Sequence, residues 1–127
     1  GTPILWWMAF AALIAGIWWW LGRRDWRFAV PVLGVLSVWL PWFQYADRPL
    51  FFFYAIVLLP FYVTGLAMAL GKILGPAHHP RRRIRAVLAG VAVALVVLHF
   101  AFIYPILSDE LLTRPEWLAR MWFGTWI

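Results

Sequence analysis

Four long apolar stretches, separated by short polar segments, dominate the sequence. They occupy about residues 4–22, 28–45, 50–71 and 86–107 and contain no Asp, Glu, Lys or Arg. Each is close to the ~20 residues that an α-helix needs to cross the hydrocarbon core of a bilayer. Strands of a membrane barrel would be about half as long and would alternate in polarity. The pattern therefore predicts an all-α fold, a polytopic membrane protein whose four transmembrane helices form one domain over residues 1–127.

Three prolines, Pro31, Pro41 and Pro60, fall within or at the ends of the second and third stretches. In a soluble helix interior each would cost about 3 kcal/mol, whereas the neighbours in a membrane bundle can satisfy the freed carbonyl. Pro60 lies in the middle of the third stretch, so we expect it to kink that helix. Packing geometry explains such a kink more simply than a mechanical hinge.

The tail, residues 108–127, carries a further helix signal. Thr113, Arg114, Pro115 and Glu116 have the spacing of a capping box, with the Thr113 side chain accepting from amides of the first turn. Arg120 follows Glu116 by four residues, so the two are expected to pair. One face of this helix would carry Trp117, Leu118, Met121 and Trp122. The pattern predicts a short helix that lies in the outer bilayer interface or packs back onto the bundle.

Composition supports a membrane solvent. Hydrophobic residues make up 65% of the chain and charged residues 13%, whereas a soluble domain carries roughly 25% charged residues. A chain of 127 residues has too much surface for its volume to bury that much apolar material. Eleven Trp suit the membrane–water interface, and the absence of Cys excludes disulfides and thiolate metal sites.

The basic residues are distributed unevenly between the two ends of the predicted helices. Of 11 Lys and Arg, eight fall in the loops after the first and third stretches: Arg23, Arg24, Arg27, Lys72, Arg81, Arg82, Arg83 and Arg85. The positive-inside rule makes that end cytoplasmic and places both ends of the chain outside the cytoplasm. The same distribution explains the net charge of +6 without nucleic acid, which is not expected as a partner.

Five further ionisable residues are candidates for chemistry. Asp109 and Glu110 are adjacent in the sequence. Because the side chains of neighbours on a helix diverge by about 100°, the pair does not form a shared acid–base site by spacing alone. Solvated residues at the boundary of a span are the simpler interpretation. His78 and His79 lack a Cys or carboxylate partner for zinc, and a loop touching anionic head groups is the simpler interpretation. His99 lies inside the fourth stretch, where a polar residue is a functional candidate. A neutral imidazole bonded to a neighbouring helix is the simpler alternative.

Arg48 is the single basic residue between the second and third stretches, and the aromatic run that ends at Tyr54 follows it. A guanidinium beside an aromatic wall can hold a lipid phosphate while the rings accept an isoprenoid chain. An ordinary interfacial anchor that reaches to head groups explains the same residues equally well. The sequence shows no phosphate loop, nucleophile elbow, zinc signature or dinucleotide fingerprint, so no metal site and no cofactor are expected.

Short blocks in a particular order run along the whole chain. They are Gly1–Trp7 (GTPILWW), Arg23–Trp26 (RRDW), Trp39–Trp42 (WLPW), Arg48–Tyr54 (RPLFFFY), Leu59–Phe61 (LPF), Phe102–Leu107 (FIYPIL) and Arg120–Ile127 (RMWFGTWI). In this order they resemble the four-span C-terminal domain of bacterial protein O-mannosyltransferases, enzymes of the GT-C type. Two departures are Thr2, where the family usually has Asn, and the stretch after Tyr54, which is more aliphatic than the family's Tyr-rich patch.

The resemblance implies an enzyme of the cell membrane that transfers mannose from polyprenyl-phosphate-mannose to Ser or Thr of exported proteins. It also implies that the essential acidic pair belongs to an N-terminal catalytic part missing from this chain, so that Asp109 and Glu110 are not that pair. This chain would then hold no catalytic residue, would be inactive alone, and would contribute Arg48 and Tyr54 to a lipid-phosphate site. Its partners would be the lipid bilayer, the lipid-linked donor, the acceptor protein and the N-terminal part of the same enzyme.

Two other classes of function are consistent with the span pattern. One is the membrane domain of a different GT-C transferase that uses a lipid-linked sugar, which the terminal Trp-Phe-x-x-Trp-Ile block disfavours. The other is a non-enzymatic four-helix membrane scaffold. An upstream reading frame with an acidic pair after its first span would exclude the scaffold.

Overall fold

The computed structural model describes residues 2–45 and 52–122, and every regular element in these residues is helical. The elements are α1 (Pro3–Arg23), the 3₁₀ helix η1 (Trp26–Phe28), α2 (Ala29–Trp39), the 3₁₀ helices η2 (Leu40–Tyr45) and η3 (Phe52–Leu58), α3 (Leu59–Leu74), α4 (Arg82–Leu107) and α5 (Arg114–Arg120). Four helical stretches are long and apolar enough to span a membrane: Pro3–Arg23, Trp26–Gln44, Ala55–Leu74 and Arg82–Leu107. They confirm the predicted all-α architecture of four spans and a short further helix.

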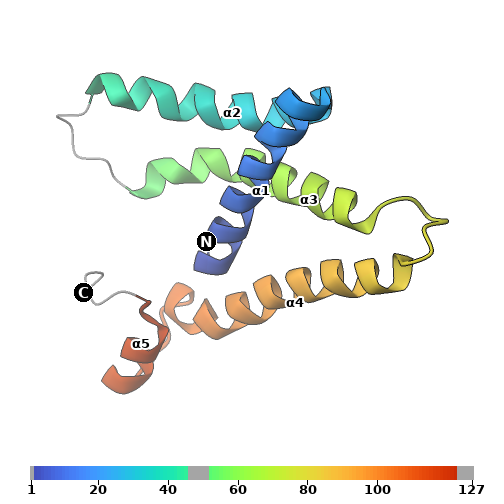
Figure 1. The fold of residues 1–127 in the computed structure, drawn as a ribbon. Helices are drawn as coiled ribbons and strands as arrows, with labels where there is room; N and C mark the ends of the chain where they lie inside the picture. The colour runs from blue at the N-terminus through green and yellow to red at the C-terminus, as the bar shows by residue number, and fades with distance from the viewer. Residues whose placement is uncertain (1, 46–51, 123–127) are drawn as a thin grey trace.

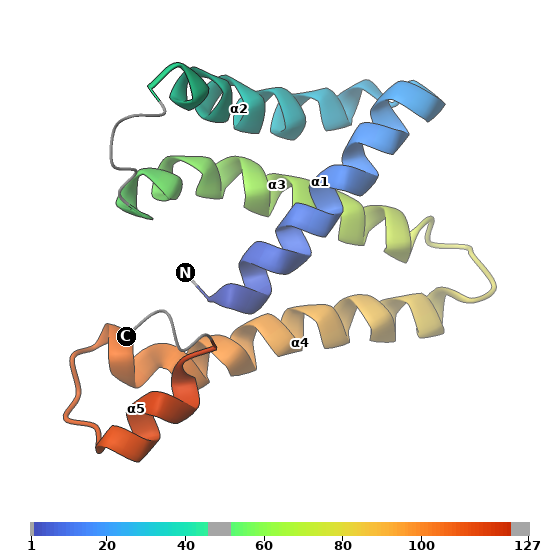
Figure 2. The same cartoon turned by 60° about the vertical axis from the view of Figure 1, so that its left-hand side comes forward.

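The first three spans pack together, and the fourth lies at the edge of the assembly. Figure 1 shows α2 and α3 side by side, with α1 crossing them at a steep angle and α4 running along the far side of α3. The view in Figure 2 shows that the start of α1 and the last third of α4 lie toward the same end as the start of α3. The opposite end gathers the end of α1, the end of α3 and the start of α4.

Small side chains line much of the buried core between α1, α2 and α3. The core cluster comprises Ala9, Ala12, Leu13, Val32, Val35, Leu58, Tyr62, Leu66 and Ala69. Many of the bulkiest apolar residues are instead exposed, including Trp7, Ile14 and Trp18. This inversion is typical of membrane helices, because lipid solvates large apolar side chains while small residues let helix backbones approach one another.

Two glycines mark the closest approaches between spans. The ring of Phe61 on α3 lies directly against Gly34 on α2, in space that a Cβ atom would need. A Cβ on Gly16 of α1 would lie 3.0 Å from Cδ1 of Phe28, which is 1% exposed. A side chain at either glycine would therefore force these aromatic rings to move.

The three prolines of the second and third spans begin helical segments, whereas Pro105 lies inside α4. Pro60 occupies the first turn of α3, at the point where the 3₁₀ helix η3 gives way to the α-helix. A proline fits there because its missing N–H would have no helical partner in a first turn. Pro31 lies in the first turn of α2 and Pro41 near the start of η2. The expected kink at Pro60 is thus a change of helix type at the start of α3.

The fourth span is the least covered of the four. Only 6% of its most apolar window is buried, compared with 22–33% for the other spans, and Ile103 is its one buried residue. Four partly buried residues share the face of Ile103 toward α1 and α3: Ala89, Ala92, Val96 and His99. Most of the remaining α4 surface is exposed, apart from its two ends, where Arg82 contacts Gly75 and Phe102 contacts Arg120.

Candidate functional site

The two residues predicted to bind a lipid phosphate fall where the structure is not described. Arg48 lies outside the described residues. Tyr54 belongs to the backbone of η3, but its side chain also lies outside the described set. Their placement in a common site therefore stays a prediction. The described elements on either side are η2, which precedes residues 46–51, and η3, which follows them. Both lie at the end of the molecule that also holds the start of α1.

At this same end, the first turn of α1 carries buried polar atoms for which the described part of the chain supplies no hydrogen-bond partner. The Thr2 side chain is 2% exposed, and its Oγ1 has no hydrogen-bond partner among the described residues. Trp6, one turn along, packs edge-on against Tyr62 of α3 with ring centroids 5.3 Å apart. Its Nε1 is likewise buried and unpartnered within the described part of the chain. Buried donors of this kind are rare in native proteins.

His99 is the candidate that the sequence placed inside a span, and the structure puts it on the inner face of α4. Both ring nitrogens are buried without a hydrogen-bond partner in residues 2–45 and 52–122. The expected bond to a neighbouring helix is therefore not found there. The rings of Trp122 and His99 instead form a T-shaped pair, with centroids 5.1 Å apart. Sequence spacing gave no sign of this contact, because Trp122 comes from the tail.

The tail folds back onto the end of α4 through Arg120. Its Nε donates to the carbonyl of Phe102 at 2.9 Å, and its Nη1 donates to the carbonyl of Glu116 at 2.7 Å. The guanidinium also lies 4.9 Å from the centroid of the Phe102 ring. The prediction that Arg120 forms an ion pair with Glu116 is wrong, because the guanidinium is used by these backbone carbonyls.

The capping box at the start of α5 is confirmed. Glu116 Oε2 accepts from the backbone N–H of Thr113 at 2.9 Å and from its hydroxyl at 2.7 Å. These two hydrogen bonds hold the pKa of the Glu116 carboxyl below its ordinary value. Of the two predicted positions of the tail, packing back onto the bundle is the one that the Arg120 contacts favour.

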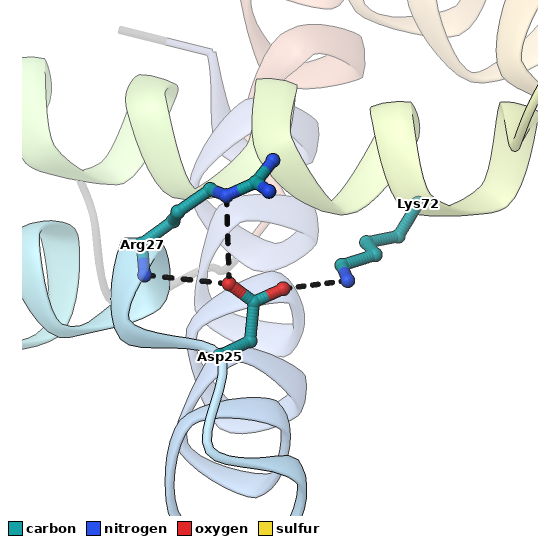
Figure 3. A network of polar contacts seen from close by, with 3 residues as sticks. All are labelled: Asp25, Arg27 and Lys72. Carbon is teal, nitrogen blue, oxygen red and sulfur yellow. Dashed lines mark hydrogen bonds and ion pairs between the residues drawn. The ribbon is translucent and has the colours of Figure 1, made fainter.

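The described ion pairs lie at the opposite end of the spans and centre on Asp25 (Figure 3). Lys72 Nζ, at the end of α3, is 2.6 Å from Asp25 Oδ2. Arg27 adds a backbone N–H to Oδ1 at 3.4 Å and its Nε at 3.8 Å. The hydrogen bond from Lys72 and the nearby positive charges lower the pKa of the Asp25 carboxyl. The network ties the loop after α1 to the end of α3.

The backbone around Asp25 is shaped by the end of α1. Arg24 adopts a left-handed conformation with φ of 53°, and its N–H donates to the carbonyl of Trp19. The N–H of Asp25 donates to the same carbonyl at 3.1 Å. This turn directs the chain into η1, where the Phe28 ring packs 5.0 Å from that of Trp19. The carboxylate is thereby held beside α3.

The remaining candidates stay apart from any site. Asp109 and Glu110 are exposed after the end of α4, and Glu110 accepts a hydrogen bond from Ser108 Oγ at 3.0 Å. His79 Nδ1 accepts from the backbone N–H of Arg81 at 3.0 Å. Within the described residues no three His, Cys, Asp or Glu side chains come together. The Asp25 carboxylate is engaged by Lys72, 2.6 Å away.

No family model matches this chain, and no solved structure does. Three curated relatives carry the name polyprenol-phosphate-mannose–protein mannosyltransferase. The protein of Mycobacterium tuberculosis is 40% identical over 131 residues, that of Mycolicibacterium smegmatis 39% over 128, and that of Corynebacterium glutamicum 31% over 128.

These matches cover 99% of this chain but only 24–25% of each relative. The chain therefore spans about a quarter of the length of the curated relatives, and the matched region is a C-terminal part of them. The four apolar helices agree with a multi-pass membrane protein. From end to end, the chain is homologous to the C-terminal membrane region of polyprenol-phosphate-mannose–protein mannosyltransferases.

Proposed function

We propose that this chain is the C-terminal membrane portion of a glycosyltransferase that moves mannose from polyprenyl-phosphate-mannose to Ser or Thr of exported proteins. In this reaction the bond between mannose C1 and the phosphate oxygen breaks, a bond to the acceptor hydroxyl oxygen forms, and the hydroxyl proton passes to a base. The observation that carries the proposal is identity of 31–40% over 99% of the chain to mannosyltransferases so named. The base that takes this proton is proposed to lie in the rest of the enzyme, outside this chain.

Within this enzyme, the chain's own contribution to the donor is a lipid-phosphate contact at Arg48 and Tyr54. A guanidinium binds phosphate oxygens in a bidentate fashion, and an aromatic ring beside it suits an isoprenoid chain. Arg48 follows the span that ends at Gln44, so it belongs to the interfacial region where a lipid phosphate lies. The role is one of binding and positioning.

The test compares Arg48→Ala with Arg114→Ala in the full-length enzyme. Arg114 is an exposed arginine of the same end of the molecule, and no partner of its side chain is found among the described residues. We expect Arg48→Ala to raise the apparent KM for polyprenyl-phosphate-mannose roughly tenfold or more, as loss of a charged hydrogen bond does. Arg114→Ala should leave it unchanged. Equal donor kinetics in the two variants would exclude the phosphate contact while leaving the mannosyltransferase assignment standing.

The orientation proposed for the membrane places both ends of the chain outside the cytoplasm. Eight of the 11 basic residues lie at the opposite end, which supports this orientation. Because the chain has no Cys, Ala77→Cys in the α3–α4 loop and Leu111→Cys in the tail report on the two sides once other cysteines of the enzyme are removed. A membrane-impermeant maleimide applied to intact cells should label only Leu111→Cys. Labelling of only Ala77→Cys would reverse the orientation.

The N-terminal part of the same enzyme is proposed to pack against α4. Two exposed faces of this helix differ in side-chain size. One carries Ile84, Leu88, Val91, Leu95, Leu98 and Phe102, and the other carries Ala86, Gly90, Ala94 and Ala101. Large aliphatic residues suit lipid, whereas small residues permit close approach of another helix. A Cβ on Gly90 would meet nothing within 4 Å.

A photo-activated cross-linker separates the two faces. It is introduced at Val97, beside the small residues, or at Leu95, among the large ones; both positions are exposed. In full-length protein in membranes, we expect Val97 to cross-link to a peptide from upstream of this chain and Leu95 to cross-link to lipid. Lipid adducts alone from Val97, or cross-links to a second copy, would contradict the packing of α4 on the N-terminal part.

A further inference from the structure

The start of α4 carries positive charge that no part of the described structure balances. Arg82, Arg83 and Arg85 occupy its first turn, Arg81 precedes them, and no acidic residue lies in that turn. The N-terminus of a helix is the positive end of its dipole, so cations there are unfavourable. Like charges four residues apart, as in Arg81 and Arg85, add to the cost.

Four neighbouring basic residues at the same end are, by contrast, already engaged: Arg23, Arg27, Lys72 and Arg82. Asp25 takes up Lys72 and Arg27, and Arg23 lies 4.9 Å from the ring of Trp18. Arg82 Nη1 donates to the carbonyl of Gly75 at 3.0 Å. In residues 2–45 and 52–122 no hydrogen bond or ion pair engages the side chains of Arg81, Arg83 and Arg85.

The sequence supplies no anion for these three arginines in either loop of this end. Asp25 is the one acidic residue between Gly1 and Ala46, and none occurs between Arg48 and Ser108. Its carboxylate is committed to Lys72, 2.6 Å away. An external anion is therefore the partner that would offset the charge.

The surface directly below the arginines is apolar and exposed. Ile84, Val87 and Leu88 are 58–62% exposed on the first turns of α4, and Ile73 is 42% exposed near the end of α3. An anion with two hydrocarbon chains fits this combination, since its phosphate meets the guanidinium groups while its chains cover the apolar residues. A soluble phosphate would leave the apolar surface uncovered.

We propose that Arg81, Arg83 and Arg85 at the start of α4 form a basic surface that binds the head groups of anionic phospholipids. The bound lipid offsets the helix dipole and the mutual repulsion of the arginines, and it anchors the least covered span in its leaflet. The site is separate from the donor-phosphate contact proposed at Arg48, which belongs to the other end of the spans.

The test uses full-length protein in nanodiscs of phosphatidylcholine alone or of phosphatidylcholine with added phosphatidylglycerol. The variant is the double substitution Arg81→Gln/Arg83→Gln. The matched control is Arg27→Gln/Arg114→Gln, which removes the same charge from positions outside the site. The readouts are the thermal unfolding midpoint and the phosphatidylglycerol retained on the protein in native mass spectrometry.

We expect phosphatidylglycerol to raise the unfolding midpoint of the wild type and of the control, and to lose this effect in Arg81→Gln/Arg83→Gln. The apparent affinity for phosphatidylglycerol should fall roughly thirtyfold in that variant, because each arginine at a membrane surface contributes about fivefold. If the variant does not fold, Arg81→Lys/Arg83→Lys keeps the charge and should retain most of the lipid. An equal response of all proteins, or an equal shift produced by inorganic phosphate in phosphatidylcholine discs, would overturn the proposal.

Discussion

The ammonium of Lys72, at the end of α3, lies 2.6 Å from the carboxylate of Asp25, in the turn that leaves α1. This contact joins two loops at the basic end of the molecule, and it lowers the pKa of the carboxyl because the ammonium favours its charged form. The Asp25 side chain is 15% exposed, whereas that of Lys72 is 44% exposed. The carboxylate is thus the better shielded partner.

Loss of the Asp25 charge should loosen the link between α1 and α3. In Asp25→Asn the ammonium of Lys72 loses its carboxylate partner and remains near seven other basic residues of these two loops. We therefore expect a lower thermal unfolding midpoint. Arg27→Gln is the matched control, because the Arg27 side chain is 86% exposed and its Nε lies 3.8 Å from the Asp25 carboxylate. A midpoint in Asp25→Asn that equals that of Arg27→Gln would contradict a stabilising role for the Lys72 contact.

The same contact predicts a dependence of stability on pH. A carboxyl whose pKa is lowered in the folded state stabilises the fold above its unfolded pKa of about 3.9. That contribution is lost as the pH falls below this value and through the folded pKa. We therefore expect the unfolding midpoint of the wild type to fall more steeply on acidification toward pH 3 than that of Asp25→Asn. Parallel curves would show that Asp25 does not contribute.

The Phe61 ring against Gly34 predicts a strong effect of a single methyl group. Gly34→Ala places a Cβ in space that the ring occupies, so we expect a loss of about 1–3 kcal/mol in the free energy of unfolding, as for other overpacked cores. Gly71→Ala is the control, since nothing lies within 4 Å of its Cβ position. It should be neutral or stabilising, because alanine favours helix more than glycine does. Similar losses in both would point to backbone effects and not to Phe61.

Removal of the Arg120 guanidinium should free the tail from α4. Arg120→Gln loses the hydrogen bond to the Phe102 carbonyl and the contact with its ring. With a net value of about 1 kcal/mol for such a bond, amide exchange in α5 should quicken roughly fivefold, as measured by hydrogen exchange of the full-length protein. Arg114→Gln, at the start of α5, should not change the rate. Unaltered exchange in Arg120→Gln would mean that other contacts hold the tail.

The imidazole of His99 has no hydrogen-bond partner within residues 2–45 and 52–122. We therefore predict that polarity at this position is dispensable for stability. Replacement by Phe keeps a ring against Trp122 and removes two buried polar atoms. We expect His99→Phe to stabilise the full-length protein by about 1–3 kcal/mol, the range for relieving an unsatisfied buried group. Reversible unfolding in detergent would measure this, with His99→Asn as the polar control. Destabilisation by Phe together with tolerance of Asn would reveal a hydrogen-bond partner in another part of the enzyme.

Several elements were predictable because their physical cause is local. The four spans follow from apolar runs whose lengths match the bilayer, and their predicted limits lie within a few residues of the observed helices. The capping box of Thr113 and Glu116 follows from spacing alone, since its atoms belong to one turn. The pairing of Glu116 with Arg120 was predicted on the same basis and was wrong, because the Phe102 carbonyl from another helix takes the guanidinium.

The arrangement of the spans was decided by tertiary structure. In a bilayer, large apolar residues are stable on either side of a helix, so hydrophobic periodicity does not show which face is buried. Ala9, Ala12 and Ala69 are therefore buried while Trp7 and Trp18 face outward, a pattern visible only once the helices are packed. The Asp25–Lys72 contact likewise joins two loops that are brought together by the packing of α1 on α3.

The sequence by itself determined that this chain is a set of membrane helices related to a mannosyltransferase, because length, charge placement and ordered motifs are properties of the linear chain. The tertiary structure alone decided which small residues form the core, which arginines keep free guanidinium groups and where the tail attaches. Those features depend on contacts between distant segments. In lipid, unlike in water, the pattern of apolar residues along a helix does not show which of its faces is buried.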